Sequence, residues 1–486
     1  MTRVAIIGAG LSGLCVGTAL RRAGIEDFVI LDRGDDVGGT WRDNTYPGCA
    51  CDIPSVLYSF SFAPNSDWSR YFAPQPEIHR YTRAVAEREG VLAHVRFGCE
   101  VTDAVWDDGR WRLTTSGGPL EADVIVCGAG PWHAPLMPDV SGLEDFAGTA
   151  FHSSRWDHEH DLRGRRVAVI GTGASAVQFV PEIQPHVEHL TVFQRTPHWV
   201  LPKPDRSVTR AEQALLRRVP GAQRLARGAV FALLELLNST MHNEQAMRQL
   251  QRLGELNLRR GVRDPRLRAQ LTPRYTLGCK RILMSNDWYP ALTRENVTVV
   301  PAAVSAIGEH AVSDALGGEH AVDTIIFGTG FQILDMPVAD IVRGASGETL
   351  ADVWQGSPRA YLGSTVSGFP NAFVMLGPNI GINTSATVIM EYQAEYVVRA
   401  LQAMAREGVG VLDVRPEVQA AFNAEVDEAL RGTVWNAGNC GSYFIDRNGR
   451  NGFNYPWTAR DLQRRLRAFD LAAYVTHEQT RSHMLA

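Results

Sequence analysis

Two apolar strands that each run into a glycine-rich turn constrain this chain more than any other feature. The first lies in residues 4–13, VAIIGAGLSG, where a strand leads into GxGxxG and a helical pattern follows. In a dinucleotide-binding fold, Gly8, Gly10 and Gly13 would allow the tight turn, the approach of a pyrophosphate and close helix–strand packing. The next strand ends at Asp32, 24 residues after Gly8, where such folds place an acid that binds ribose. The order of these features predicts a dinucleotide site near the N-terminus.

The same pattern recurs in residues 166–176, RVAVIGTGASA, where an apolar strand leads into GxGxxA. The positions of this second motif are Gly171, Gly173 and Ala176. The strand that follows ends in Arg195 and Thr196, where a site for NAD would have an acid. A cation at this point can pair with a 2′-phosphate, which an acid would repel. We therefore expect the first site to bind FAD and the second to bind NADPH.

Two further apolar strands, residues 124–127 and 324–327, each follow an aspartate and end in a small-residue turn. They fit the points where a chain passes between two domains. The sequence thus predicts an α/β fold with two Rossmann-like dinucleotide-binding domains. We expect an FAD domain in two parts, 1–137 and 332–486, with an NADP domain inserted at 138–331.

Residues from about 204 to 272 are rich in Arg, Leu, Ala and Gln, and their apolar residues recur at helical spacing. This pattern predicts a helical insertion in the NADP domain. The apolar positions are Leu215, Leu216, Val219 and Leu225, and we expect them to pack as core or lid rather than against a membrane. A second amphipathic pattern, residues 385–402, predicts a helix that closes the FAD domain.

Composition excludes several classes of protein. The 486 residues carry a net charge of −5, with 45% hydrophobic and 21% charged residues, which are ordinary globular values. A dedicated nucleic-acid-binding protein would normally be strongly basic. No apolar run approaches the roughly 20 residues that span a bilayer. The N-terminus starts with a strand-like run, so we expect no signal peptide.

The seven cysteines are scattered and odd in number, which does not resemble a disulfide framework. We expect free thiols in a reducing compartment, the cytoplasm. Cys49 and Cys51 are separated by one residue, a spacing that suits neither a CxxC redox pair nor a zinc site. We therefore expect no metal.

Between the two dinucleotide motifs lies FAGTAFHSSRWD, residues 146–157. It matches FxGxxxHxxxW followed by Asp, and on this motif the chain resembles the type I Baeyer–Villiger monooxygenases. The matching positions are Phe146, Gly148, His152, Trp156 and Asp157. The resemblance implies that His152 couples domain motion rather than acting as a general base.

The resemblance extends along nearly the whole chain. Gly38-Gly39-Thr40-Trp41 and Cys51-Asp52 are similar to the family's flavin-side stretch, and Gly278-Cys279-Lys280-Arg281 is similar to its active-site arginine segment. Ser442-Tyr443-Phe444 stands where several members carry Ser-Trp-Tyr. The FAD contacts that the resemblance adds are Gly39, Thr40, Trp41, Asp52 and Asn379. Lys280 is expected to bind the 2′-phosphate of NADPH together with Arg195 and Thr196.

The resemblance also implies a reaction. NADPH reduces FAD, the reduced flavin captures O2 as a C4a-peroxyflavin, and this species attacks a ketone to give an ester or lactone. A fixed cation stabilises the peroxide and the developing oxyanion, and arginine suits this role because it does not deprotonate. Arg281 matches the family's arginine, and Asp52 matches the acid that holds it. The expected partners are a small ketone and O2, with no nucleic acid.

Other functions are open to a chain with these motifs. A flavin monooxygenase that oxygenates sulfur or nitrogen has a similar architecture, but Trp156-Asp157 and Arg281 favour the Baeyer–Villiger reaction. A flavin disulfide reductase needs a redox cysteine pair beside the flavin, for which Cys49 and Cys51 are badly spaced. A flavin-binding module without activity would not need the second site.

Overall fold

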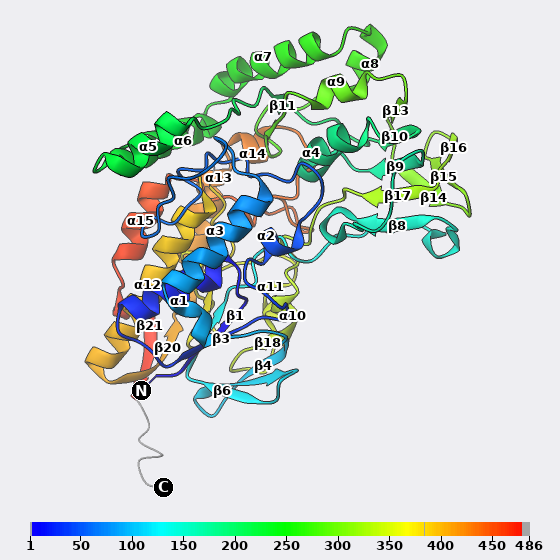
Figure 1. Cartoon of the computed structure of the whole chain (residues 1–486). Coiled ribbons are helices and arrows are strands. Elements are labelled where there is room, and N and C mark those ends of the chain that lie inside the picture. Colours follow the sequence, from blue (N-terminus) through cyan, green and yellow to red (C-terminus); the bar gives the residue numbers. More distant parts are fainter. Residues whose placement is uncertain (1, 383, 479–486) are drawn as a thin grey trace.

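Two parallel five-stranded sheets, each containing one of the glycine-rich turns, organise the chain (Figure 1). The computed structural model describes residues 2–382 and 384–478. The first sheet has the order β19-β7-β1-β2-β3. Its strands are β1 (Val4–Ile7), β2 (Phe28–Leu31), β3 (Val95–Arg96), β7 (Val124–Cys127) and β19 (Ala372–Val374). Since β19 comes from late in the chain, this fold is built from two separate parts of the sequence.

Side chains of the first sheet alternate between two hydrophobic cores, as the two-residue period of a strand requires. Val4 and Ile6 pack in the core that contains the helices α1 (Leu11–Arg22) and α12 (Ala386–Glu407). Ala5 and Ile7 pack on the other face, against a smaller sheet of order β18-β4-β5-β6. The strands of that sheet are β4 (Val101–Asp107), β5 (Arg110–Thr115), β6 (Leu120–Ala122) and β18 (Val342–Arg343).

The second parallel sheet repeats this plan in the middle of the chain, with the order β13-β10-β9-β17-β8. Its strands are β8 (Thr149–His152), β9 (Arg166–Ile170), β10 (His189–Phe193), β13 (Val297–Val300) and β17 (Thr324–Phe327). Val167 and Val169 share a core with α4 (Ala174–Ile183) and α9 (Trp288–Leu292). Ala168 and Ile170 share a core with β14 (Val304–Ile307) and β15 (Ala311–Asp314), which pair with β16 (Glu319–Ala321). The Rossmann-like fold class predicted from the sequence is confirmed.

The chain passes between the two folds twice, and the two passages lie side by side. Pro135 and Phe331 form an antiparallel bridge. Leu136 N donates to Gly330 O at 2.9 Å, and Gln332 N donates to Ala134 O at 3.0 Å. Relative movement of the two folds therefore has to bend both passages at one place.

Helices occupy the predicted insertion, and in Figure 1 they run along the top of the molecule. They are α5 (Arg210–Arg218), α6 (Ala222–Ser239), α7 (Glu244–Gly261) and α8 (Pro265–Gln270). The remaining helices are α2 (Thr40–Asp43), α3 (Gln75–Arg88), α10 (Val338–Ile341), α11 (Leu350–Trp354), α13 (Pro416–Leu430), α14 (Val434–Ala437) and α15 (Ala459–Arg467). Two small pairs of strands complete the described fold, β11 (Val200–Leu201) with β12 (Leu283–Met284) and β20 (Val409–Val414) with β21 (Tyr474–Glu478).

Three of the apolar residues that were expected to form core or lid in this insertion lie at the surface, so that prediction is wrong for them. Leu215, Val219 and Leu225 are 54%, 46% and 78% exposed. For Leu225 the physical reason is that α6 turns polar side chains inward, where they satisfy main-chain groups of neighbouring loops. Leu215 and Val219 belong to α5 and its C-cap, and no residue of α5 is buried. Among the described residues, no helix is long and apolar enough to cross a bilayer.

The helix predicted over residues 385–402 is α12, and it continues for one further turn to Glu407. It ends at Gly408, whose φ of +68° places it in the left-handed region. Glycine adopts this conformation without steric cost, so it is a common helix terminator.

We expect Gly13→Ala to destabilise the protein by about 3 kcal/mol or more, because the new methyl group has no space. A Cβ atom at Gly13 would lie 1.9 Å from the carbonyl oxygen of Gly8. Gly228→Ala is the matched control, since a Cβ atom there meets nothing within 4 Å and alanine favours a helix. Thermal unfolding of both variants measures the effect, and equal melting temperatures would contradict this account of the turn.

Candidate active site

A cavity of about 390 Å³ opens at the carboxyl ends of the strands in the first sheet. Ligands of parallel α/β folds bind at this edge. The cavity brings together six of the residues predicted to contact FAD: Gly8, Gly10, Asp32, Gly39, Thr40 and Trp41.

The glycine-rich turn packs so closely that larger residues would not fit. Gly8 has a φ of +104°, and a Cβ atom on it would lie 2.9 Å from the carbonyl oxygen of Gly128. A Cβ atom on Gly39 would lie 3.1 Å from Cα of Gly10, so the two backbones face each other at the cavity. Gly13 lies beneath the turn, where it lets α1 approach β1.

Both helices that follow a glycine-rich turn begin without a capping side chain. The N-cap residues are Gly10 for α1 and Gly173 for α4, and neither helix has an acidic residue in its first turn. The first N–H groups of a helix lack partners within it and carry partial positive charge. Both helix ends therefore fit a dinucleotide phosphate.

Asp32 ends β2 at the rim of the cavity and is held by three donors. Its carboxylate accepts from Ala9 N at 2.7 Å and from Gly34 N at 2.8 Å, and it pairs with Arg42 at 3.0 Å. The acid is thereby fixed where a ribose would lie.

Asn379 does not line this cavity, although it was predicted to contact FAD. Its Nδ2 donates to the carbonyl oxygens of Asn451 at 2.8 Å and Asn454 at 3.0 Å, and its Oδ1 accepts from Arg450 at 2.7 Å. These bonds occupy the side chain and tie it to the C-terminal loop.

The second turn repeats the packing of the first. Gly171 also has a φ of +104°, and a Cβ atom on it would lie 2.5 Å from the carbonyl oxygen of Gly328. Ala176 is buried, and its Cβ atom lies where it would be 3.4 Å from a Cβ built on Gly328. A Cβ atom on Gly173 would make only an ordinary contact, 3.9 Å from the carbonyl oxygen of Gly328, so this part of the turn is less tightly packed.

Two cations meet beyond the end of β10. Arg195 is exposed and is followed by the half-buried Thr196. Burial and the charge of Arg195 lower the pKa of Lys280, which shows that the two cations are close. Among the described residues, neither cation forms an ion pair with an acid. Such a pair of cations favours an anion between them.

His198 adds a third group to these cations. Burial, together with Lys280, lowers its pKa to about 4, so the imidazole is neutral at neutral pH. Its Nδ1 atom is shielded from solvent and has no hydrogen-bond partner within the described part of the chain. An unpaired buried polar atom beside two cations fits a polar ligand.

The motif at residues 146–157 packs along the second sheet. A Cβ atom on Gly148 would lie 2.3 Å from the carbonyl oxygen of Asp323, and the ring of Phe146 covers the same place. Trp156 packs against Phe179 of α4, with ring centroids 5.4 Å apart. These three residues therefore help to build the fold itself.

His152 ends β8 beside the second passage between the folds. Its ring packs edge-on against Phe331 at 5.6 Å, and its Nδ1 lies 2.8 Å from Oγ of Ser154. Burial lowers its pKa to about 4, which leaves it neutral and poorly matched to general-base work near pH 7.

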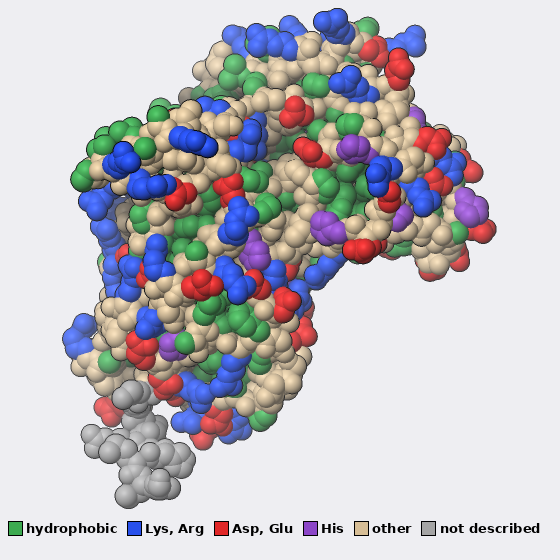
Figure 2. Space-filling view, in the orientation of Figure 1, with side chains coloured by type: hydrophobic (Ala, Val, Ile, Leu, Met, Phe, Trp, Pro, Cys, Tyr) green, Lys and Arg blue, Asp and Glu red, His purple; other side chains and the backbone are tan. Residues whose placement is uncertain are grey.

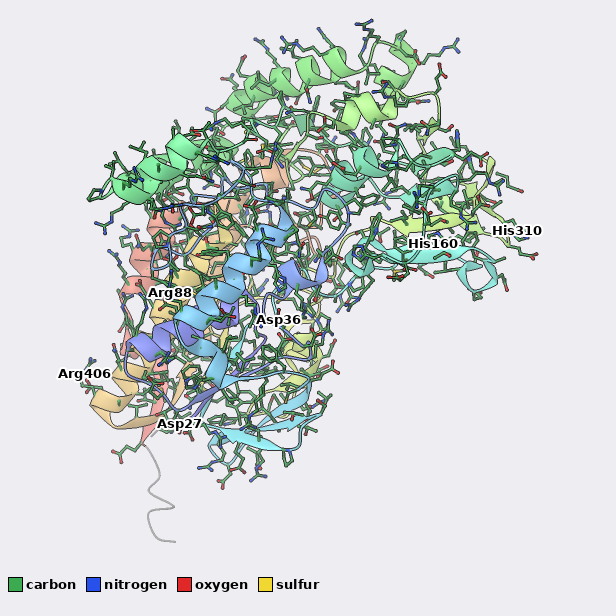
Figure 3. The ribbon with its side chains drawn as sticks, in the orientation of Figure 1. Asp27, Asp36, Arg88, His160, His310 and Arg406 are labelled. Atoms are coloured by element: carbon green, nitrogen blue, oxygen red, sulfur yellow. A yellow bond between two sulfur atoms is a disulfide. The ribbon has the colours of Figure 1, made fainter. Side chains whose placement is uncertain are left out.

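Asp157 closes a turn after the motif. Its Oδ1 accepts from His160 N at 3.2 Å. His160, labelled in Figure 3, lies 2.8 Å from Oγ1 of Thr324 at the start of β17. Asp157 thus supports the second sheet through the turn that carries His160.

Arg281 and Asp52 form an ion pair between segments that are 229 residues apart. Their side chains are 37% and 31% exposed, so the pair is partly open to solvent. The Asp52 carboxylate raises the pKa of Arg281 further above its ordinary value, and the Tyr443 hydroxyl is a second partner of the guanidinium. The cation is therefore permanently charged and held from two sides.

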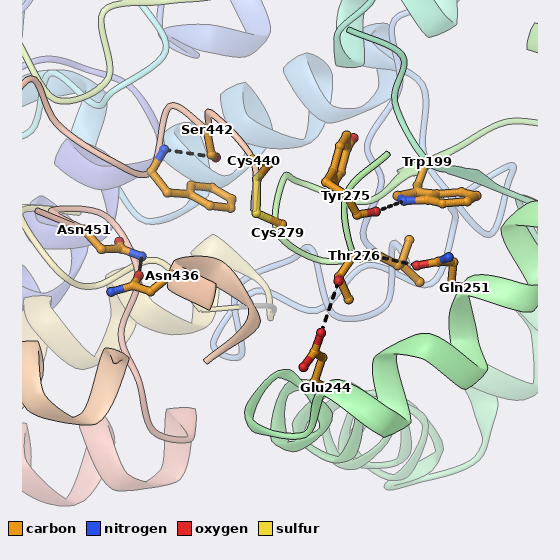
Figure 4. Close-up of a disulfide and its surroundings, with 12 residues drawn as sticks. Trp199, Glu244, Gln251, Tyr275, Thr276, Cys279, Asn436, Cys440, Ser442 and Asn451 are labelled. Carbon is orange, nitrogen blue, oxygen red and sulfur yellow. Dashed lines mark hydrogen bonds between the residues drawn. A yellow bond between two sulfur atoms is a disulfide. The ribbon is translucent and has the colours of Figure 1, made fainter. Parts of the chain in front are cut away.

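A disulfide joins Cys279, two residues before Arg281, to Cys440, three residues before Tyr443 (Figure 4). It joins the loop of Arg281 to the loop of Tyr443, and Thr276 N also donates to Gly438 O at 3.2 Å. The prediction of free thiols is wrong for these two cysteines, because the fold brings together loops 161 residues apart. The other five cysteines are free and buried.

Cys49 and Cys51 do not form a redox pair. Both are buried free thiols, and burial raises the pKa of Cys49 to about 12. Burial also raises the pKa of Cys51. A reactive redox cysteine needs an accessible thiolate, so this region does not support disulfide reduction.

Three features of this site were missed by reasoning from the sequence. Tyr443 was noticed only as a departure from a family pattern, and His198 and the disulfide were not predicted. Each depends on contacts between distant segments, although the nearness of Cys279 to Arg281 in the sequence was a usable signal.

Relatives of known name resemble the chain over nearly its full length. Residues 5–219 match the family described as pyridine nucleotide-disulphide oxidoreductase. A protein named Baeyer–Villiger monooxygenase from Streptomyces coelicolor is 46% identical over 97% of this chain and 92% of its own length. A protein of the same name from Pseudomonas aeruginosa is 44% identical over 97% of this chain and 91% of its own length.

Solved structures of monooxygenases also resemble the chain over nearly its full length. Cyclohexanone monooxygenase from Rhodococcus sp. Phi1, bound to NADP+, superposes with a TM-score of 0.88 at 26% identity and covers 98% of this chain and 99% of its own. Oxidised steroid monooxygenase bound to NADP superposes with a TM-score of 0.86 at 27% identity and the same coverage.

We expect alkylation of the denatured, unreduced protein to label five cysteines, and alkylation after reduction to label all seven. The five are the free thiols, and the additional two are Cys279 and Cys440. Intact mass spectrometry counts the labels. Seven labels without reduction would show that the pair is not bonded in the purified protein.

Proposed function

The chain belongs to the Baeyer–Villiger monooxygenase family, and we propose that Arg281, held by Asp52 and Tyr443, is the cation that acts at its reacting centre. The enzyme depends on FAD and NADPH and inserts one oxygen atom from O2 beside a ketone carbonyl, which gives an ester or lactone. Oxygenation of sulfur or nitrogen is not favoured. The observation that carries the proposal is the ion pair of Arg281 and Asp52, which joins segments 229 residues apart.

We assign the 390 Å³ cavity to FAD. The uncapped start of α1 would bind the pyrophosphate, Asp32 would bind the ribose, and Trp41 would lie along the flavin side. Trp41 Nε1 donates to the Tyr58 hydroxyl at 2.9 Å, which fixes the indole at the wall of the cavity.

We assign NADPH to the second fold, with its pyrophosphate at the start of α4. Arg195 and Lys280 would bind the 2′-phosphate, with Thr196 beside them as a hydroxyl donor. Because Lys280 precedes Arg281 in the sequence, one loop would carry both the nucleotide contact and the reacting cation.

We propose domain boundaries where the two passages meet, near residues 137 and 331. His152 lies at this place, against Phe331, so its proposed role is to couple movements of the two domains. We also propose a cytoplasmic location, where the Cys279–Cys440 disulfide would be open to reduction.

FAD, when bound and reduced by NADPH, supplies the oxygen-activating chemistry. The chain contributes a fixed positive charge at Arg281, whose N–H groups can donate to the substrate oxygen as it becomes negative. Asp52 and Tyr443 hold the guanidinium in place, so little reorganisation is needed when charge develops. The cation does not lose its proton to the substrate, because its pKa is raised by Asp52.

We expect Arg281→Ala to abolish ester formation while flavin binding survives, because the cavity for FAD does not include this residue. Loss of one such contact costs about 3–4 kcal/mol in the chemical step, or a factor of several hundred. The assay is a panel of ketones with NADPH, with ester measured by mass and hydrogen peroxide measured separately. NADPH should still be consumed, with peroxide as the product.

Two further variants sharpen this test. Arg281→Lys keeps the charge but loses the planar guanidinium that pairs with both Asp52 and Tyr443, so an intermediate rate is expected. Arg406→Ala removes an exposed arginine and should leave the rate unchanged. Ester formation by Arg281→Ala near the wild-type rate would disprove the proposed role.

We expect Arg195→Ala to raise the KM for NADPH by about 10- to 100-fold, the effect of losing a charge-assisted hydrogen bond worth roughly 1.5–3 kcal/mol. The KM for NADH should not change, because NADH has no 2′-phosphate. Arg163→Ala, which removes an exposed arginine of the same fold, is the control. An equal loss with both nucleotides would contradict the assignment of Arg195.

A further inference from the structure

Helix α6 has the reverse of the usual amphipathic arrangement, because charged side chains face the rest of the protein. Arg227 Nη1 donates to the carbonyl oxygens of Leu57 at 3.0 Å and Ser59 at 2.6 Å. The carboxylate of Glu235, which is only 9% exposed, accepts from Ala459 N at 3.0 Å at the start of α15. These bonds to main-chain groups attach the helix through its charged residues rather than through its leucines.

The opposite side of α6 is apolar and faces solvent. Leu225, Leu233 and Leu236 are 78%, 52% and 65% exposed. At about 100° per residue, they fall on one face together with the exposed Ala229 and Ala232. A surface helix of a globular protein normally has the reverse arrangement.

Helix α5 extends this surface. We call the combined surface the outer apolar face, and its residues are Leu215, Val219, Leu225, Ala229, Ala232, Leu233 and Leu236. Figure 2 shows hydrophobic side chains gathered over α5 and α6, with basic side chains among them. A contiguous exposed apolar patch on a folded protein indicates an interaction surface.

The charge around the outer apolar face indicates what it contacts. Residues 210–239, which contain α5 and α6, have five arginines and two acidic residues, a net charge of +3, whereas the whole chain carries −5. Arg218 and Arg224 are exposed beside the apolar face, and neither forms an ion pair within the described residues. Two copies meeting through this face would place like charges together, so an anionic partner is favoured.

We propose that α5 and α6 bind the surface of a membrane that contains anionic lipid. The leucines would enter the boundary between headgroups and acyl chains, and the arginines would contact the phosphates. The helices would lie in the surface and not cross it, because no helix of the described chain is long and apolar enough to span a bilayer. This inference does not depend on the oxygenation reaction.

The test is sedimentation of the flavin-loaded, full-length protein with lipid vesicles. Binding is expected to vesicles with about 30% phosphatidylglycerol in phosphatidylcholine, and it should weaken as salt is raised. Vesicles of phosphatidylcholine alone should bind at least about tenfold less, because the arginines then lack an anionic headgroup.

The triple variant L225S/L233S/L236S should lose about tenfold or more of this binding, and R218Q/R224Q should lose most of the salt dependence. Leu316→Ser is the matched control, because Leu316 is a 74% exposed leucine on a turn outside the insertion. Bound flavin and melting temperature verify that each variant is folded.

Three results would overturn the proposal. The first is equal binding of the triple variant to the anionic vesicles, and the second is no binding of the wild type to them. The third is a wild-type dimer in analytical ultracentrifugation that the triple variant converts to a monomer, which would assign the outer apolar face to a second copy of the chain.

Discussion

The ion pair of Arg281 and Asp52 connects the two folds at the proposed active site. Asp52 belongs to the first fold and Arg281 to the loop after the insertion, 229 residues later. A partly buried guanidinium loses some of its hydration, and a carboxylate partner offsets that loss. The two side chains are still about one-third exposed, so the pair adds little to the free energy of unfolding. Its main effect is to fix the position of the guanidinium. The contact links the two folds directly, beside the place where we propose that the cofactor, the nucleotide and the substrate react.

Local sequence was sufficient to predict the two folds. The strands at residues 4–7 and 166–170 and the turns after them were predicted because glycine spacing and hydrophobic runs are short-range signals. The close packing of Gly8 on Gly128 and of Gly171 on Gly328 explains why both turns need glycine. The pairing of Arg281 with Asp52 was also anticipated, although from a family resemblance and not from spacing.

The failures share a physical cause, which is that they depend on partners distant in the sequence. The partners of Asn379 could not be predicted either, since its side chain bonds to three residues within 450–454, and its contact with FAD stays a prediction. The expected burial of Leu225 rested on amphipathic periodicity, which identifies the apolar face but not the direction in which it points. In α6 that direction is set by Arg227 and Glu235, which bond to main-chain groups of other segments, and Arg227 also pairs with Glu391 at 3.6 Å. Periodicity therefore predicted helices in this segment but not that Leu225 would face solvent.

The loop that carries Arg281 is attached to both folds, and this limits how the enzyme can move. On one side, β12 pairs with β11 of the inserted fold. On the other side, the Cys279–Cys440 disulfide and the bond from Thr276 to Gly438 attach it to the C-terminal part of the first fold. If the two sheets move about the paired passages at Pro135 and Phe331, the loop must bend between Arg281 and Leu283. Arg281 would then stay with Asp52 while the nucleotide fold moves, so that the cation keeps its place during exchange of the nucleotide.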